Sequence, residues 1–347
     1  MKAWERLSRE EVIKAVDGQY PARIPLCRAK WIGEGFAEQY GDKLRQLDSI
    51  QDDVVQVFVP NPINWNRMNL SWDVKEGGAL DTSIILDDWG KLDEFIEKIP
   101  TPDAFPEIEL AAKHIEKARA EGYYVHIGWW NLFFERLWKL RGMENLMCDF
   151  YTDPEDLGRL YDAVATAYVK MLDAVCSICK PDGFFSSDDL GHQTGPMMSP
   201  DIFHEQVFPF YKRFGDCIHK HGMHFWLHSC GNNLPLMEDL IAAGVSVFHP
   251  VQKFTMDEAA TMEQFGGRIT FLAGIDVQHT LQEKTPEEVR AEVRFLIDTF
   301  DRPEGRMCIA AGNGIVGGTP LENVLAYLEE AVSYGAKHRA NMNAMRE

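Results

Sequence analysis

Short apolar runs alternate with amphipathic stretches from one end of the chain to the other. The runs consist mostly of Val, Ile, Leu and Phe and show little alternation of apolar and polar positions, which is typical of parallel strands covered on both faces. We therefore expect eight strands, over Arg23–Trp31, Val54–Val59, Tyr123–Gly128, Gly183–Ser187, Met223–His228, Val245–Pro250, Arg268–Gly274 and Arg306–Ala311.

The amphipathic stretches carry helix-start signals. Five of them match the S/T-x-x-E pattern, in which a hydroxyl and a carboxylate satisfy free N–H groups of the first helical turn. The matches begin at Ser8, Thr152, Thr255, Thr285 and Thr319. Helices are therefore expected between the strands and at both ends of the chain.

Strand–helix alternation repeated eight times predicts an α/β fold of the (β/α)8 TIM-barrel type, which commonly needs about 250 residues. A doubly wound open sheet is the alternative, but no Gly-rich phosphate loop follows the first run. The extra length is expected in a helical extension over Ser8–Val16 and in a long insertion over Asn61–Asp88, after the second strand. Long connections on this side of a barrel often form lids, and this one carries Trp65 and Trp72.

No low-complexity linker divides the sequence, so residues 1–347 are expected to form one domain. The chain has 35 Lys and Arg against 54 Asp and Glu, a formal charge of −19. Such an excess of negative charge excludes nucleic acid and anionic membrane surfaces as expected partners. No apolar run approaches the roughly 20 residues of a membrane span, and the N-terminus does not resemble a secretory signal. We expect a cytoplasmic protein, and its seven cysteines do not suggest a disulfide framework.

The carboxyl ends of the strands are where a TIM barrel places its chemistry, and polar or aromatic side chains occupy these positions. The residues expected to contact a substrate are Arg28, Trp31, Asn61, Trp129, Trp130, Gln252 and Asn313. The residues expected to act as acids, bases or ligands are Asp188, Asp189, His192 and Asp276. Several aromatic side chains on one face favour a planar substrate.

His228 and Cys230 form the pattern most suggestive of a metal site. Residues i and i+2 at a strand exit can point to the same side, and an imidazole with a thiolate suits zinc. The alternative is that Cys230 packs beside a glycine turn and His228 hydrogen-bonds to the pocket wall. The third ligand remains open among Asp188, Asp189, His192, Asp276 and, less well placed, Cys308.

Asp188 and Asp189 are neighbours at the end of the fourth strand, so they cannot both face inward. One is expected to enter the barrel mouth and the other to cap a helix or pair outside it.

Elsewhere, Cys176 and Cys179 are interpreted as core-facing thiols one helical turn apart. The histidines of the 203–224 segment are interpreted as surface or interhelical residues; they are His204, His219, His221 and His224.

Taken in order, several blocks of the chain resemble the uroporphyrinogen decarboxylase superfamily across essentially its whole length. The blocks are Ser8–Ala15, Pro181–Asp189, His219–Gly231, Gly274–Asp276 and Gly314–Asn323. The resemblance implies the same barrel. True uroporphyrinogen decarboxylases carry an arginine-rich segment after the first strand, of which only Arg28 remains here. A porphyrinogen with eight carboxylates is therefore disfavoured as substrate.

The His-x-Cys-Gly block instead resembles the corrinoid-dependent methyltransferases of the same superfamily. That resemblance implies zinc held by His228, Cys230 and a later cysteine, and the position of this cysteine is taken here by Asn313. Together with the aromatic residues expected at the mouth, it favours the O-demethylating type. Such an enzyme moves a methyl group from a methoxylated aromatic to the cobalt of a separate corrinoid protein, which is expected to dock on the strand-end face.

Other functions remain open at this stage. One is a zinc-dependent methylcobamide:thiol methyltransferase, and another is a decarboxylase of a small aromatic or heterocyclic acid. A non-enzymatic corrinoid- or ligand-binding subunit is a third, although the chain lacks the D-x-H-x-x-G motif that holds cobalamin. A homodimer is one option for the oligomeric state.

Overall fold

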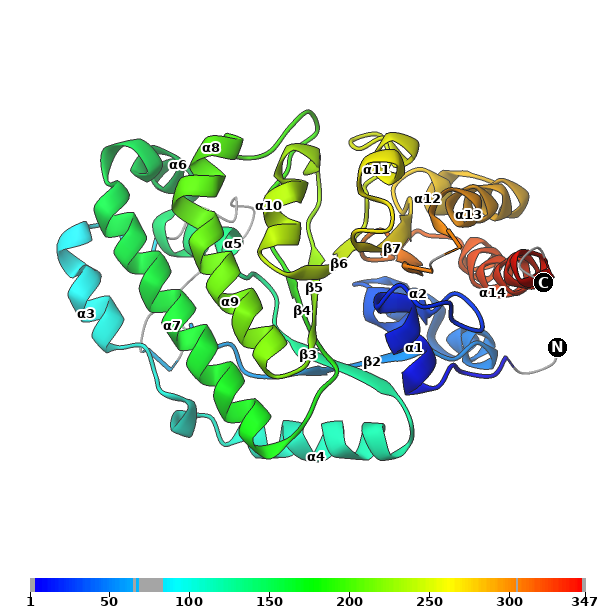
Figure 1. Cartoon of the computed structure of the whole chain (residues 1–347), viewed down its shortest axis with the longest axis horizontal. Helices are drawn as coiled ribbons and strands as arrows, with labels where there is room; N and C mark the ends of the chain where they lie inside the picture. Colours follow the sequence, from blue (N-terminus) through cyan, green and yellow to red (C-terminus); the bar gives the residue numbers. More distant parts are fainter. Residues whose placement is uncertain (1–3, 65–66, 69–83, 304, 345–347) are drawn as a thin grey trace.

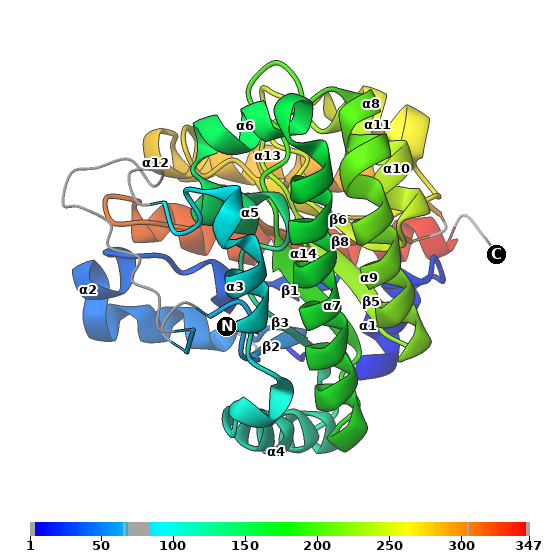
Figure 2. The ribbon, with the colours of Figure 1, turned by 90° about the vertical axis from the view of Figure 1, so that its left-hand side faces the viewer.

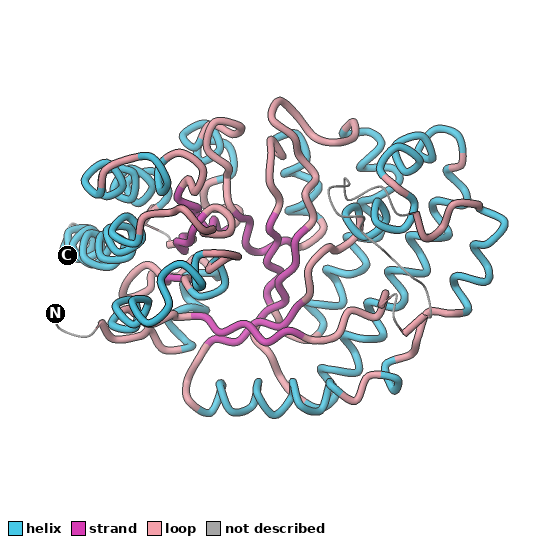
Figure 3. Tube along the Cα trace, turned by 180° about the vertical axis from the view of Figure 1, so that it is seen from behind, coloured by secondary structure: helices cyan, strands magenta, loops and turns pink. Residues whose placement is uncertain are grey.

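The structure is a computed structural model that describes residues 4–64, 67–68, 84–303 and 305–344. These residues form a parallel sheet of eight strands in the order β1-β8-β7-β6-β5-β4-β3-β2, surrounded by helices (Figures 1 and 3). The strands are β1 Leu26–Cys27, β2 Val54–Phe58, β3 Tyr124–Gly128, β4 Gly183–Ser187, β5 His224–His228, β6 Val245–His249, β7 Thr270–Ile275 and β8 Met307–Ala311. The predicted (β/α)8 TIM barrel is confirmed.

Helices form the outer layer of this barrel, and Figure 2 shows it from the side of α7 and α9. Their bounds are α1 Arg9–Val16, α2 Phe36–Tyr40, α3 Leu92–Glu97, α4 Glu107–Ala120, α5 Phe134–Arg141, α6 Met143–Thr152, α7 Pro154–Ile178, α8 Pro200–Ile202, α9 Phe208–Lys220, α10 Met237–Ala242, α11 Glu258–Phe265, α12 Thr280–Glu283, α13 Pro286–Phe300 and α14 Leu321–Ala344. Within the described ranges, no helix is long and apolar enough to cross a membrane.

The first strand is much shorter than its apolar run predicts. Only Leu26–Cys27 pairs with β8, and Ala29–Trp31 forms a 3-10 turn. The N–H of Arg28 donates to the carboxylate of Asp52 instead of continuing the ladder. The chain therefore turns early and brings Lys30 and Trp31 to the barrel mouth.

Asp53 closes the seam between β1 and β2. Its N–H donates to the carbonyl of Leu26 at 3.0 Å, and its carboxylate accepts the N–H groups of Leu26 at 2.8 Å and Leu7 at 2.7 Å. Arg23 completes the arrangement with two hydrogen bonds of 2.6 Å to the same carboxylate. Asp53 is fully buried and both of its carboxylate oxygens are paired. These hydrogen bonds join β1 to the start of β2, so the barrel is nearly closed at this point.

The expected N-terminal extension is confirmed as α1, which crosses the opposite end of the barrel from the mouth. Arg9 donates to Asp182, just before β4, at 2.7 Å. On the other side, Thr270 at the start of β7 donates to the carbonyl of Val16 at 2.8 Å. The expected lid over Asn61–Asp88 lies largely outside the described residues, as do Trp65 and Trp72.

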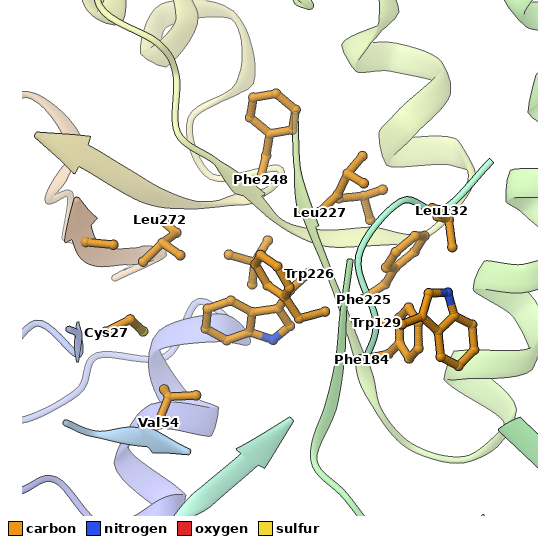
Figure 4. Close-up of a cluster of buried hydrophobic side chains, with 14 of the residues drawn as sticks. Cys27, Val54, Trp129, Leu132, Phe184, Phe225, Trp226, Leu227, Phe248 and Leu272 are labelled. Carbon is orange, nitrogen blue, oxygen red and sulfur yellow. The ribbon is translucent and has the colours of Figure 1, made fainter. Parts of the chain in front are cut away.

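The barrel core determines which side chains reach the mouth. On β5, Trp226 points into the barrel and is fully buried, while Phe225 and Leu227 belong to the neighbouring layer (Figure 4). Because side chains alternate along a strand, His228 shares the inward side with Trp226, one layer closer to the mouth. β5 thus places the imidazole of His228 at the rim of the barrel, directly above the buried side chain of Trp226.

Candidate metal centre and active site

Three metal-binding side chains meet where β4 and β5 end. Nε2 of His228 lies 3.4 Å from Sγ of Cys230 and 3.7 Å from Oδ1 of Asp189. All three donor atoms lie within 4.8 Å of one another. The structure therefore brings together the two residues that the sequence singled out as metal ligands and places Asp189 beside them as the candidate for the third.

The donor set fits zinc. Zinc–nitrogen and zinc–oxygen bonds of about 2.0 Å and zinc–sulfur bonds of about 2.3 Å, at tetrahedral angles, separate the donor atoms by about 3.3 to 3.6 Å. The separations between His228 and its two neighbours are close to this range. Asn313, at the position where the family resemblance implies a cysteine, donates from Nδ2 to Sγ of Cys230 at 3.4 Å. An amide that donates to the sulfur supports a thiolate but supplies no third ligand.

His249 fixes which nitrogen of His228 faces the other donors. Nε2 of His249 lies 2.9 Å from the carbonyl oxygen of Ala311, which can only accept, so this nitrogen carries the proton. Burial, reinforced by the charge that His228 would carry, lowers the pKa of His249 well below its usual value, so the ring is neutral and its Nδ1 accepts. Nδ1 of His228, at 2.7 Å, must therefore be the donor. Nε2 of His228 is left with a lone pair directed at Cys230 and Asp189.

Burial also keeps His228 itself neutral, since it lowers the pKa of this residue to about 4. The ring of Trp31 stacks on His249 with centroids 4.4 Å apart and planes inclined at 24°. Neutral imidazole is the form that binds a metal, and the stacked indole limits rotation of the supporting ring. The sequence does not mark His249 as a site residue, because it lies inside the expected strand Val245–Pro250.

Asp188 has a structural role, which corrects its prediction as a catalytic residue. Its carboxylate is fully buried and accepts the N–H groups of Phe133 and Phe134 at 3.0 Å and of Glu135 at 2.7 Å. The hydroxyl of Tyr211 also donates to it. Asp188 thus holds the first turn of α5. The two neighbouring aspartates divide their roles as strand geometry requires, one inward and one outward.

Glu135 is a buried carboxyl that the sequence reading missed. Its Oε2 accepts from the hydroxyl of Ser187 at 2.7 Å. Burial, and secondarily the charge of Asp189, raise the pKa of Glu135. Glu135 is therefore a buried carboxyl close enough to Asp189 to sense its charge, and it holds its proton more readily than usual. The residue belongs to a helix, so a search limited to strand ends does not find it.

Lys30 is a second missed residue. Its Nζ is buried and has no hydrogen-bond partner within the described part of the chain. It faces the ring of Phe185, and the ring centroids of Trp130 and Trp31 lie at 5.4 Å and 5.6 Å. Burial lowers the pKa of Lys30 well below its usual value. The aromatic side of the mouth therefore encloses an amine, and its position between Arg28 and Trp31 in the sequence was the available signal.

A pocket of about 220 Å³ opens beside Cys230. Among the predicted residues it gathers Cys230, His192, Gln252, Asp276 and Asn313. Gln252 accepts the N–H of Gly231 at 2.7 Å, which holds the turn after Cys230. The oxygens of Asp276 accept backbone N–H groups of residues 278–280, so this aspartate also caps the chain that leads into α12.

The remaining predicted contacts are distributed differently. Trp130 is 38% exposed at the mouth, and it meets edge-on, at 6.3 Å, the ring of Trp31, which is buried beneath it. Trp129 does not lie at the mouth: it is buried among Tyr168, Phe184 and Phe214 in the layer between strands and helices (Figure 4).

The predicted substrate contact of Trp129 is therefore corrected to a packing role, because strand alternation turns it away from its neighbour Trp130. The side chains of Arg28 and Asn61 contact nearby backbone and side-chain groups. Nε of Arg28 lies 3.6 Å from the carboxylate of Asp52, and Asn61 accepts the N–H of Ile63 at 2.8 Å.

A family model described as uroporphyrinogen decarboxylase (URO-D) matches residues 125–334, more than half of the chain. No curated protein matches the sequence. Among solved structures, a methyltransferase from Methanosarcina mazei is similar with a TM-score of 0.68 at 16% identity, over 95% of this chain and 99% of that one. D-psicose 3-epimerase from Clostridium cellulolyticum H10 gives a TM-score of 0.45 at 7% identity, over 90% of this chain and 99% of that one. At 16% identity, the likeness to the methyltransferase concerns the fold alone.

Proposed function

The chain belongs to the uroporphyrinogen decarboxylase family, and on that premise we propose that it is a zinc-dependent methyltransferase serving a corrinoid protein. The observation that carries the proposal is the meeting of Asp189, His228 and Cys230 at the barrel mouth, with a neutral His228 whose Nε2 faces the other two donors. Three protein ligands and an adjacent pocket are the arrangement of a catalytic zinc site. The Methanosarcina methyltransferase named above, which has the same fold, is consistent with this branch.

The proposed reaction transfers the methyl group of an aryl methyl ether to the Co(I) centre of a separate corrinoid protein. The O–CH3 bond breaks, the cobalt supplies the electron pair of the new Co–CH3 bond, and the phenolate leaves and takes up a proton. A bound zinc ion supplies a Lewis acid for the ether oxygen. Asp189, His228 and Cys230 would hold that ion.

The pocket residues position the substrate in this proposal. Gln252 and Asn313 offer amide groups at the pocket wall, and His192 stands at its outer edge as a group able to exchange the proton. The ring of Trp130 is 38% exposed, lies with its centroid 6.5 Å from that of His228 and can border a planar molecule, and the buried ring of Trp31 packs against it. In this proposal the ring of Trp130 and the amides of Gln252 and Asn313 border the aryl ether.

Exposed apolar side chains around the mouth support docking of the corrinoid protein on this face. Phe58 at the end of β2 is 54% exposed, and Phe254 in the connection after β6 is 73% exposed. Trp130 follows β3 and Val316 follows β8, and both are also exposed. Large apolar side chains left in water around a pocket are typical of a protein–protein contact.

A polycarboxylate substrate has little support in this pocket. Among the described lining residues the one lysine is Lys253, and its Nζ already pairs with Glu292 and lies 3.9 Å from Glu258. The chain's overall charge of −19 adds to the repulsion. These observations favour a neutral substrate over a porphyrinogen.

The proposal is tested by anaerobic incubation with a reduced corrinoid protein and a panel of methoxylated aromatics, followed by the absorbance of methylcobalamin. Cys230→Ser is expected to reduce the rate at least about 100-fold because it removes a metal ligand. Cys148→Ser, an exposed cysteine on α6, is the matched control and should leave the rate unchanged. Carbon dioxide release without corrinoid, or full activity of Cys230→Ser, would refute the proposal.

A further inference from the structure

A second group of metal-binding side chains lies in the outer layer, between α7 and α9, which run side by side (Figures 1 and 2). Cys217 and His221 are four residues apart at the end of α9 and therefore share one face of the helix. Asp173 approaches them from α7. Nε2 of His221 lies 2.6 Å and Sγ of Cys217 lies 3.9 Å from Oδ1 of Asp173, and all three donor atoms lie within 4.8 Å of one another.

The local surroundings suit an ion that is partly enclosed. Cys217 is buried, with 6% of its surface exposed, and the side chain of His221 is 21% exposed. Cys176 stands three residues after Asp173 on the same helix, so it presents a further thiol to the same side of α7. Nζ of Lys220 lies 3.2 Å from Asp173, but its side chain is 66% exposed and can move into water.

The distances are close to those of a tetrahedral site. Zinc bonds of about 2.0 to 2.3 Å separate donor atoms by about 3.3 to 3.6 Å. The Cys217–Asp173 separation exceeds this range slightly and the His221–Asp173 separation falls below it. Rotations within the three side chains correct both without moving the helices. A carboxylate, an imidazole and a thiolate form a mixed donor set that zinc and cobalt(II) accept.

We propose that Asp173, Cys217 and His221 form a second binding site for a divalent zinc-type ion, with water completing its coordination. The site is separate from the barrel mouth and does not rest on the proposed methyl transfer. Its effect is structural: the ion ties the end of α9 to α7. α9 leads directly into β5, which carries His228 to the mouth, so the clamp supports the strand from its far end.

The test uses the full chain, freed of metal with a chelator and titrated anaerobically with Co(II). Thiolate–cobalt charge-transfer absorbance reports cysteine ligation, and Cys230→Ser removes this signal from the barrel mouth. The Cys230→Ser protein is expected to bind one equivalent of Co(II) with a thiolate band. Adding Cys217→Ser should abolish that band, whereas adding Cys148→Ser should leave it unchanged.

His221→Asn, made in the same Cys230→Ser background, keeps the test decisive if Cys217→Ser fails to fold. It is expected to weaken Co(II) binding at least about 10-fold and to remove the rise in thermal midpoint that the ion produces. The proposal is overturned if Cys230→Ser shows no thiolate–cobalt band. It is equally overturned if the band survives both Cys217→Ser and His221→Asn.

Discussion

At the scale of single residues, the orientation of one imidazole determines whether the barrel mouth can hold a metal ion. His228 presents Nε2 to Cys230 and Asp189 because its Nδ1 proton is committed to His249. His249 in turn is committed to a backbone carbonyl that cannot change its role. The hydrogen bonds of His249 therefore determine that the lone pair of His228 faces the candidate metal site.

Removing His249 tests this chain of hydrogen bonds. His249→Ala is expected to lower zinc affinity by about 10- to 100-fold, because the His228 ring loses both its orientation and its preferred tautomer. Zinc competition against a chelating dye measures the change on purified protein. His249→Asn, whose side-chain oxygen can accept the Nδ1 proton, should recover part of the affinity. Wild-type zinc binding by His249→Ala would contradict the mechanism.

The neighbouring aspartates at the end of β4 should respond differently to the same substitution. Asp188→Asn is expected to lower the free energy of unfolding by about 2 to 4 kcal/mol, since an amide NH2 would face the backbone N–H groups that Asp188 accepts. Asp189→Asn should cost much less stability and should instead reduce the zinc content. Urea unfolding and metal analysis of both variants distinguish the two roles. Equal stability losses would refute the assignment.

At the scale of elements, strand positions could be predicted well and helix caps could not. Seven of the eight expected runs contain a strand of similar extent, because buried parallel strands need continuous apolar sequence. The S/T-x-x-E pattern was less reliable. It forms a full capping box at Thr285, whereas α11 is capped by Asp257 and Thr152 ends a helix instead of starting one. The pattern supplies the right groups but does not fix the backbone and rotamers that a cap requires.

Replacing the hydroxyl residues Thr285 and Ser8 tests whether a formed cap stabilises the protein more than an unformed one. Thr285→Ala is expected to lower the free energy of unfolding by about 1 kcal/mol, because the side chain accepts an N–H of the first turn of α13 and its partner Glu288 closes the box. Ser8→Ala should cost clearly less, since Ser8 makes no such side-chain cap on α1. Denaturant unfolding of both variants gives the comparison. A larger loss for Ser8→Ala would show that the capping geometry is wrong.

The site divides in the same way into predictable and unpredictable parts. Asp189, His228 and Cys230 could be found because each lies at or just after the end of a strand and carries a group that can bind a metal. Glu135 comes from a helix, and it is brought near by hydrogen bonds between the start of α5 and the end of β4. Lys30 depends on the early end of β1. No local sequence pattern identifies residues that reach a site only through tertiary packing.

At the scale of the whole molecule, the barrel contains buried histidine side chains that are neutral. Burial lowers the pKa values of His126 and His249 well below their usual range and that of His228 to about 4. The unfolded chain takes up these protons near its ordinary histidine pKa of about 6.5, whereas the folded barrel resists them. The stability contribution is therefore complete above about pH 6.5 and is lost as the pH falls toward the folded values.

The free energy of unfolding of the metal-free protein should therefore fall between about pH 6.5 and pH 4, with His228 alone contributing about 3 kcal/mol to the fall. His126 is the group to vary, because its ring stacks on Phe185 with centroids 5.5 Å apart and lies away from the metal donors. His126→Leu removes one titrating group from the core and should make the decline with pH shallower. Denaturant unfolding of both proteins from about pH 8 to about pH 4.5 provides the comparison. Parallel curves for wild type and His126→Leu would mean that His126 does not contribute to the acid sensitivity.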